Sequence, residues 1–154
     1  MLDPRETPPE RAPDRGVPPI ILVIDDHQDT LDAYSAFLSA QGYWVATAAT
    51  ALEGIAYAQD VRPDAVVTDL GLPGPRDGVD LIRALQAHPT LKQTPIVAVT
   101  GREPRDLPSM SGVQVSALLV KPVSSRALLE RVAAAIEQAA AERRDGRDGR
   151  DDGR

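Results

Sequence analysis

Five short apolar runs rich in Val, Ile, Leu and Ala recur along the chain, and a stretch with helical periodicity follows the first three and the last. The runs lie at 20–24, 43–49, 64–70, 95–101 and 116–123. Continuous apolar runs of this length are typical of strands covered on both faces. Strands that alternate with helices form a parallel sheet with helices on both faces, joined by right-handed crossovers. The pattern therefore predicts an α/β fold built on one doubly wound, five-stranded parallel sheet.

Four segments place apolar residues at helical spacing, at 29–42, 50–62, 78–88 and 124–144. The second begins at Thr50 with Glu53 three residues later, which is a capping-box signature, and we expect Leu52, Ile55 and Ala56 to form its inner face. The stretch 101–115 should hold a further helix, but it contains two prolines and few apolar residues. Because proline inside a helix costs on the order of 3 kcal/mol, we expect a short, irregular or mobile helix there.

The composition divides the chain into one domain and two tails. Residues 1–19 hold six of the 14 prolines, and 143–154 are a polar run of Asp, Gly and Arg. Neither segment can bury enough apolar surface to offset its ordering entropy, so we expect both to be disordered. The domain should span 20–142. About a dozen polar residues after the last helix are too few for a second domain, which predicts a stand-alone protein.

Charge and cysteine content limit the classes of function. The chain has no cysteine, which excludes disulfides, thiolate catalysis and cysteine-bound zinc. Its net charge of -6 argues against a nucleic-acid partner, because phosphate binding needs a basic surface. The first residues lack the apolar core of a signal peptide, and no stretch approaches the roughly 20 apolar residues of a membrane span. We expect a soluble, cytoplasmic protein that does not bind membranes.

Polar residues stand at the predicted ends of four strands: Asp25 and Asp26, Asp69, Thr100, and Lys121. In an open α/β sheet, ligands bind outside the carboxyl ends of the strands. Taken singly, an aspartate in such a place most often caps the next helix, and a lysine is most often solvated. All five residues at one edge of the sheet favour a shared site.

The charges of this set suggest a chemistry. Three crowded carboxylates require a cation, and oxygen donors select a hard ion such as Mg²⁺. Lys121 and the Thr100 hydroxyl could then bind oxygens of a phosphoryl group beside the metal. The chain has neither a Walker loop nor a glycine-rich dinucleotide motif. A side chain is therefore the better candidate for the phosphate acceptor, and Asp69 is the central candidate because aspartate can act as the nucleophile.

Four separated motifs resemble those of one family. "VIDDH", "VVTDLGLPG", "VAVTG" and "LLVKPV" are similar, in order and close to the expected spacing, to the motifs of receiver domains of two-component response regulators. The resemblance covers about 20–140. It implies a flavodoxin-like (βα)5 fold and a phosphoprotein in phosphorelay signal transduction. Such a protein is not an enzyme in the usual sense, although it catalyses its own phosphorylation and dephosphorylation.

The resemblance also implies a role for each site residue. Asp69 would be the phosphoacceptor, and Mg²⁺ would be held by Asp26, Asp69 and the backbone carbonyl of Gly71, with Asp25 acting through water. Thr100 and Lys121 would contact the phosphoryl group, and the Lys121–Pro122 bond would be cis. The phosphodonor would be a sensor histidine kinase or a histidine phosphotransfer protein, and the signal would pass to a downstream protein or along a phosphorelay.

Departures from the family pattern, among them the breaker-rich stretch 101–115, leave alternatives open. Receivers usually carry Tyr or Phe three residues before the conserved lysine as a rotating switch, and here that residue is Leu118. A binding module of the same fold, with degenerate or constitutive switching, is therefore an alternative function. An unrelated enzyme on a similar fold, such as a small phosphatase or a nucleotide-binding protein, is a third, which the missing phosphate loop disfavours.

Overall fold

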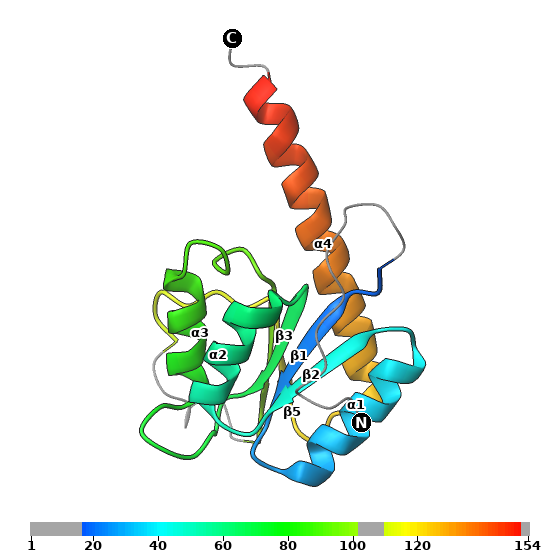
Figure 1. Cartoon of the computed structure of the whole chain (residues 1–154), viewed down its shortest axis with the longest axis vertical. Coiled ribbons are helices and arrows are strands. Elements are labelled where there is room, and N and C mark those ends of the chain that lie inside the picture. The colour runs from blue at the N-terminus through cyan, green and yellow to red at the C-terminus, as the bar shows by residue number, and fades with distance from the viewer. Residues whose placement is uncertain (1–16, 102–109, 152–154) are drawn as a thin grey trace.

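The computed structural model describes residues 17–101 and 110–151 as five strands and four helices (Figure 1). The five strands form one parallel sheet in the order β2-β1-β3-β4-β5. This confirms the predicted doubly wound fold. The elements along the chain are β1 (Ile20–Ile24), α1 (Gln28–Ala40), β2 (Trp44–Ala48), α2 (Ala51–Val61), β3 (Ala65–Asp69), α3 (Gly78–Ala87), β4 (Ile96–Thr100), β5 (Ala117–Val120) and α4 (Ser125–Asp151).

The sheet is covered on both faces by helices. Alternate residues of β1 point to opposite faces, so Leu22 and Ile24 pack with α2 and α3, whereas Ile21 and Val23 pack with α1 and α4. Every residue of β1, β3 and β4 is buried. This burial explains why these strands are continuous apolar runs in the sequence: a strand covered on both faces has no solvated side to carry polar residues.

Strand register brings distant polar residues to one level of the sheet. Ile24 pairs with Thr68, so the next residues, Asp25 and Asp69, lie side by side at the carboxyl edge. Thr100 pairs with Val120, which places the following Lys121 just beyond the end of β4. None of the helices in the described residues has the length and apolar character that a membrane span requires.

The buried face of α2 differs from the prediction. Its buried residues are Ala51, Gly54 and Ala58, whereas Leu52 is 57% exposed. The helix lies so close to the sheet that a Cβ on Gly54 would come within 2.8 Å of Ile24 Cδ1. Small residues allow this close approach. A ranking by hydrophobicity favours the larger Leu52 and so misses the face of small residues.

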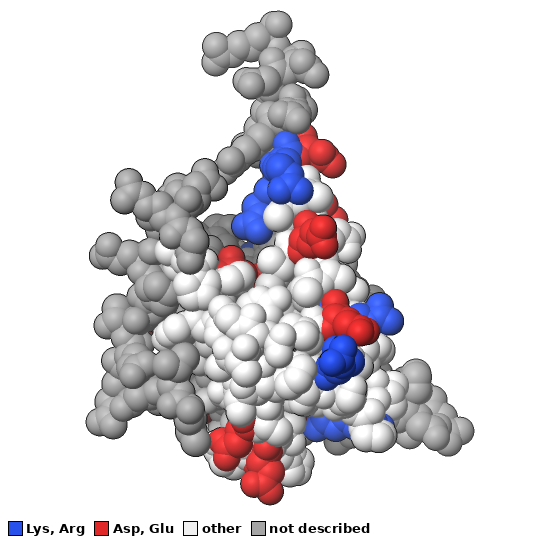
Figure 2. Space-filling model, turned by 90° about the vertical axis from the view of Figure 1, so that its right-hand side faces the viewer, with Lys and Arg blue, Asp and Glu red and all other residues white. Residues whose placement is uncertain are grey.

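Helix α4 is longer than the sequence indicates, because it continues to Asp151 where a disordered tail was predicted from residue 143. Its first half packs on the sheet through Leu128, Val132 and Ala135. Once a helix exists, each further residue adds one hydrogen bond, so propagation is easier than nucleation. Acidic and basic side chains lie together along the projecting part of α4 (Figure 2), which suits a solvated helix.

The region between β4 and β5 forms no helix among its described residues. Residues 102–109, within the predicted irregular helix, lie outside the described part of the chain, as does the predicted tail up to residue 16. Beyond that gap, Gly112 takes a φ of 75° in a turn, a conformation that glycine adopts without a steric penalty. On β5, Ala117 and Leu119 pack on the α1–α4 side, while Leu118 and Val120 are 40% and 53% exposed on the other.

Candidate functional site

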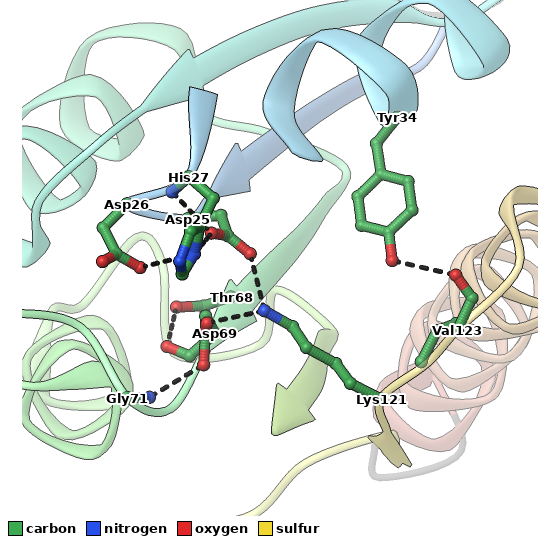
Figure 3. Close-up of polar contacts among 9 residues, drawn as sticks. All are labelled: Asp25, Asp26, His27, Tyr34, Thr68, Asp69, Gly71, Lys121 and Val123. Carbon is green, nitrogen blue, oxygen red and sulfur yellow. Dashed lines mark hydrogen bonds and ion pairs between the residues drawn. The ribbon is translucent and has the colours of Figure 1, made fainter. Parts of the chain in front are cut away.

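Two buried carboxylates occupy the carboxyl edge of the sheet. Asp25 follows β1 and is 3% exposed, and Asp69 ends β3 and is 7% exposed. Buried aspartates are rare unless another group pairs with them. Figure 3 shows that each points toward the same ammonium group. The Lys121 Nζ lies 3.1 Å from Asp25 Oδ2 and 2.9 Å from Asp69 Oδ2.

Lys121 reaches this edge from the end of β5. Its backbone N–H donates to the Thr100 carbonyl at 2.8 Å, which continues the pairing of the two strands and fixes where the side chain starts. Partial burial of the ammonium would lower the pKa of Lys121, but hydrogen bonds to Asp69 and Asp25 outweigh burial and raise that pKa above its ordinary value. Lys121 therefore remains a cation across the physiological range.

Both oxygens of the Asp69 carboxylate accept hydrogen bonds. Oδ1 accepts from the backbone N–H of Gly71 at 2.8 Å, and Oδ2 accepts from Lys121. The next helix supports this strand end closely, because a Cβ on Gly78 would overlap the Asp69 carbonyl oxygen. Asp77 caps that helix, and its carboxylate and that of Asp80 form a reciprocal capping box. The capped helix thus holds the backbone of Asp69 in place.

The two aspartates of the "VIDDH" motif have different surroundings. Asp25 Oδ1 accepts from the backbone N–H of His27 at 2.8 Å, and its other oxygen accepts from Lys121. The side chain of Asp26 is 30% exposed, against 5% for that of Asp25. Asp25 is thus a fixed, internally bonded group, whereas Asp26 faces the mouth of the site.

The donor set fits a divalent cation. Carboxylate oxygens of three aspartates and a ring nitrogen of His27 all lie within 4.8 Å of one another; the residues are Asp25, Asp26, His27 and Asp69. Three carboxylates against one ammonium leave two formal negative charges unbalanced. Oxygen donors of this kind suit Mg²⁺, Mn²⁺ or Ca²⁺. The cluster can therefore hold a metal ion.

The remaining predicted residues lie around this cluster in different ways. Thr100 is 1% exposed at the end of β4, at the same edge of the sheet. The Lys121–Pro122 peptide bond is cis. Leu118 faces away from the cluster on the exposed side of β5. The site residues predicted from four strand ends thus share one edge, whereas the residue at the usual switch position is at the surface.

Two further residues lie at the site without a sequence motif of their own that predicts a role. His27 lies beside both aspartates of its motif, and its place directly after them was the available clue. Tyr34 of α1 donates its hydroxyl to the Val123 carbonyl at 3.1 Å and so connects α1 to the segment after Lys121 (Figure 3). Burial raises the pKa of Tyr34, an effect that the nearby ammonium partly offsets. Nothing local in the sequence relates these residues, because 89 positions separate Tyr34 from Val123.

Comparison with known proteins gives a consistent result. The family model "Response regulator receiver domain" matches residues 21–133. The transcriptional regulatory proteins AfsQ1 of Streptomyces coelicolor and PrrA of Mycobacterium tuberculosis are each 34% identical, over 78% and 81% of this chain. The chain spans about half the length of these relatives, 52% and 53%.

Solved structures agree with the sequence relatives. The chemotaxis response regulator CheY4 of Vibrio cholerae has a TM-score of 0.70 and 28% identity, covering 77% of this chain and 98% of that one. A CheY-like response regulator receiver domain protein from Methanospirillum hungatei has a TM-score of 0.71 and 28% identity, covering 81% and 98%.

Proposed function

The chain belongs to the response regulator receiver family, and from this premise we propose that Asp69 accepts a phosphoryl group in a Mg²⁺-dependent reaction. Receiver domains take phosphoryl groups from histidine kinases in two-component signalling, and they act as phosphoacceptor switches rather than as conventional enzymes. One observation carries the assignment to Asp69. Its buried carboxylate ends β3, the strand between β1 and β4, so it lies between the Asp25–Asp26 pair and Thr100, and its Oδ2 accepts from Lys121 at 2.9 Å.

The residues around Asp69 would each contribute to transfer. An Asp69 oxygen attacks phosphorus, the bond from phosphorus to the donor nitrogen breaks, and an acyl phosphate forms. Lys121, 2.9 Å from Asp69 Oδ2, would shift to an oxygen of the incoming phosphoryl group and neutralise its charge. The Thr100 hydroxyl would donate to another phosphoryl oxygen. Phosphoryl transfer depends on such positioning and charge stabilisation more than on covalent chemistry by the protein.

The same cluster would bind Mg²⁺ through Asp26, Asp69 and the carbonyl of Gly71. When bound, the ion supplies positive charge that stabilises the phosphoryl oxygens. Direct ligation by Asp26 is supported by its more exposed side chain, since magnesium keeps several waters and needs an open approach. Asp25, the most deeply buried of the three aspartates at 3% exposure, would act through water.

The test is phosphate incorporation from a small donor. The wild-type protein should label with acetyl phosphate in the presence of Mg²⁺ and lose label when the metal is chelated. Asp69→Asn should abolish labelling, because its amide is a poor nucleophile of nearly the same shape. Asp60→Asn, which alters an exposed aspartate of α2, is the matched control and should label normally. Equal labelling of Asp69→Asn and the wild type would exclude Asp69 as the acceptor.

The phosphodonor we propose is a sensor histidine kinase or a histidine phosphotransfer protein. The recipient of the signal would be a further protein, because the chain is acidic overall, with a net charge of -6, and an acidic surface disfavours nucleic acid. The two relatives from Streptomyces and Mycobacterium are named as transcriptional regulatory proteins. A gel-shift assay with duplex DNA tests this part of the proposal, and binding by the isolated chain would contradict it.

A second function, docking without regulated switching, is favoured by Leu118. This side chain is 40% exposed and has neither the hydroxyl nor the ring by which an aromatic switch residue couples to the threonine. The phosphate mimic beryllofluoride separates the two functions. A regulated receiver should show amide shifts between residues 100 and 118 in NMR spectra, and an absence of shifts there would support constitutive docking.

A further inference from the structure

The histidine of the "VIDDH" motif lies inside the acidic cluster. The Nδ1 atom of His27 is 3.2 Å from Asp25 Oδ1 and 3.3 Å from Asp26 Oδ1. Figure 3 shows the imidazole ring between the carboxylates of Asp25 and Asp26. The ring is 68% exposed, so it stands at the mouth of the site and not in the core.

The backbone on both sides of His27 fixes this placement. Its N–H donates to Asp25 Oδ1 at 2.8 Å, and its carbonyl accepts the first hydrogen bond of α1, from Leu31, at 3.1 Å. His27 occupies the N-cap position of α1, yet its side chain caps no backbone group. Histidine is not among the residues that favour this position. Helix capping therefore does not account for a histidine there.

The spacing of the donor atoms matches that of metal ligands. In an octahedral site with bonds of about 2.1 Å, neighbouring ligand atoms are about 3.0 Å apart. The 3.3 Å between His27 Nδ1 and Asp26 Oδ1, an oxygen of the proposed ligand set, is slightly longer than this. The imidazole nitrogen and this oxygen could therefore bind one ion after a movement of a few tenths of an ångström, which an exposed ring makes at little cost.

A nitrogen donor changes which ion the cluster prefers. Magnesium binds oxygen donors, whereas imidazole suits first-row transition ions, whose affinities for nitrogen sites rise from Mn²⁺ toward Ni²⁺ and Cu²⁺. Three carboxylates alone make a magnesium-type site. The same carboxylates with one imidazole make a mixed site that binds transition ions more tightly.

We propose that His27 is a metal ligand through Nδ1 and raises the affinity of the site for divalent transition ions relative to Mg²⁺. This inference rests on the proposed function, because it concerns the same metal site. It adds a ligand to the set of Asp26, Asp69 and Gly71. It also means that the metal occupying this receiver depends on which divalent ions are present.

The test is a pair of calorimetric titrations of the untagged protein, one with Ni²⁺ and one with Mg²⁺. In His27→Asn, the ratio of Ni²⁺ affinity to Mg²⁺ affinity should fall at least about tenfold, since even outer-shell partners of a ligand change metal affinity by this factor. His88→Asn is the matched control, because His88 ends α3 and bonds to Thr90, and the ratio should stay as in the wild type.

A spectroscopic readout locates the ion independently of affinity. Ni²⁺ is paramagnetic, so ring signals of His27 should broaden at lower Ni²⁺ concentration than those of His88. Asp26→Asn should lower the affinity of the site for both Ni²⁺ and Mg²⁺, because it removes a ligand that the two ions share. Undiminished Ni²⁺ binding in that variant would mean that nickel binds elsewhere, which overturns the inference.

The remaining outcomes separate the two proposals. An unchanged ratio in His27→Asn excludes His27 as a ligand while leaving the magnesium site intact. Tighter binding of both ions in His27→Asn also overturns the inference, because it shows that the ring competes with the metal for the carboxylates. Failure of the wild type to bind either ion contradicts the proposed function itself, and the ligand role of His27 with it.

Discussion

Replacing Gly78 by alanine should destabilise the fold and disturb the site. A Cβ at this first residue of α3 would lie 2.7 Å from Leu70 Cα and would overlap the Asp69 carbonyl oxygen. Ordinary van der Waals contact begins near 3.4 Å, so the two chain segments would have to separate by about 0.7 Å at Leu70 and by more at the Asp69 carbonyl. Both obstructing groups are backbone, and neither can rotate away. The end of β3, which carries Asp69, would have to move.

Two opposing effects set the size of the loss. Overpacking of this kind costs about 1–3 kcal/mol, whereas replacing glycine stabilises by about 0.4–1 kcal/mol through the lower entropy of the unfolded chain. Because both clashes are with backbone, the overpacking cost lies at the upper end of its range, and a net loss of about 2–2.6 kcal/mol remains. Urea denaturation followed by the fluorescence of Trp44, the single tryptophan, measures this change. Labelling by acetyl phosphate should also slow, because Asp69 no longer holds its position.

Gly54→Ala is the matched control. The nearest atom to its new Cβ would be Ile24 Cδ1 at 2.8 Å, the end of a side chain that can rotate. In the middle of α2, alanine also gains about 1 kcal/mol of helix propensity over glycine, so the net change should be near zero. The reasoning fails if Gly78→Ala is as stable as the wild type, or if the two variants lose the same stability.

Three further predictions follow from the packing and the charges. Tyr34→Phe should cost about 0.5–1.5 kcal/mol in urea denaturation, because the half-buried Val123 carbonyl loses its donor; an unchanged midpoint would contradict this. The raised pKa of Lys121 means that its ion pairs stabilise the fold fully below the ordinary lysine pKa of 10.5 and are lost as the pH rises through the higher value. The wild type should therefore lose more stability than Lys121→Met above that pH, and parallel curves would refute the coupling. Leu52→Gln should change stability by less than about 0.5 kcal/mol, whereas Leu81→Ala should cost about 2–5 kcal/mol, and similar losses would show that Leu52 is buried after all.

The strands and the candidate site residues could be predicted from the sequence for a common reason. A strand buried on both faces needs an unbroken apolar run, so the first polar residue marks its end. In a parallel sheet these ends share one edge, which is why Asp25, Asp69, Thr100 and Lys121 could be placed near one another without coordinates. The family motifs then supplied an expected role for each residue, and those roles stay predictions.

Two features could not be predicted in the same way: how closely α2 approaches the sheet, and how far α4 continues along the chain. The buried face of α2 is made of small residues, because the helix lies close to Ile24, and hydrophobicity does not report distance. Helix α4 continues to Asp151 because a packed first half nucleates it, although the composition of its last residues suits a disordered tail. Both errors arose from interpreting a segment without its neighbours.

The sequence by itself determined the α/β fold, the order of strands and helices along the chain, and the edge of the sheet where the polar residues gather. Tertiary structure alone decided the contacts at that edge: Lys121 between two buried carboxylates, His27 beside the aspartate pair, and Tyr34 against Val123. The physical reason is the separation along the chain between the residues that make each contact. Periodicity and burial leave a record in neighbouring residues, whereas a contact between side chains up to 96 positions apart depends on strand register and helix placement.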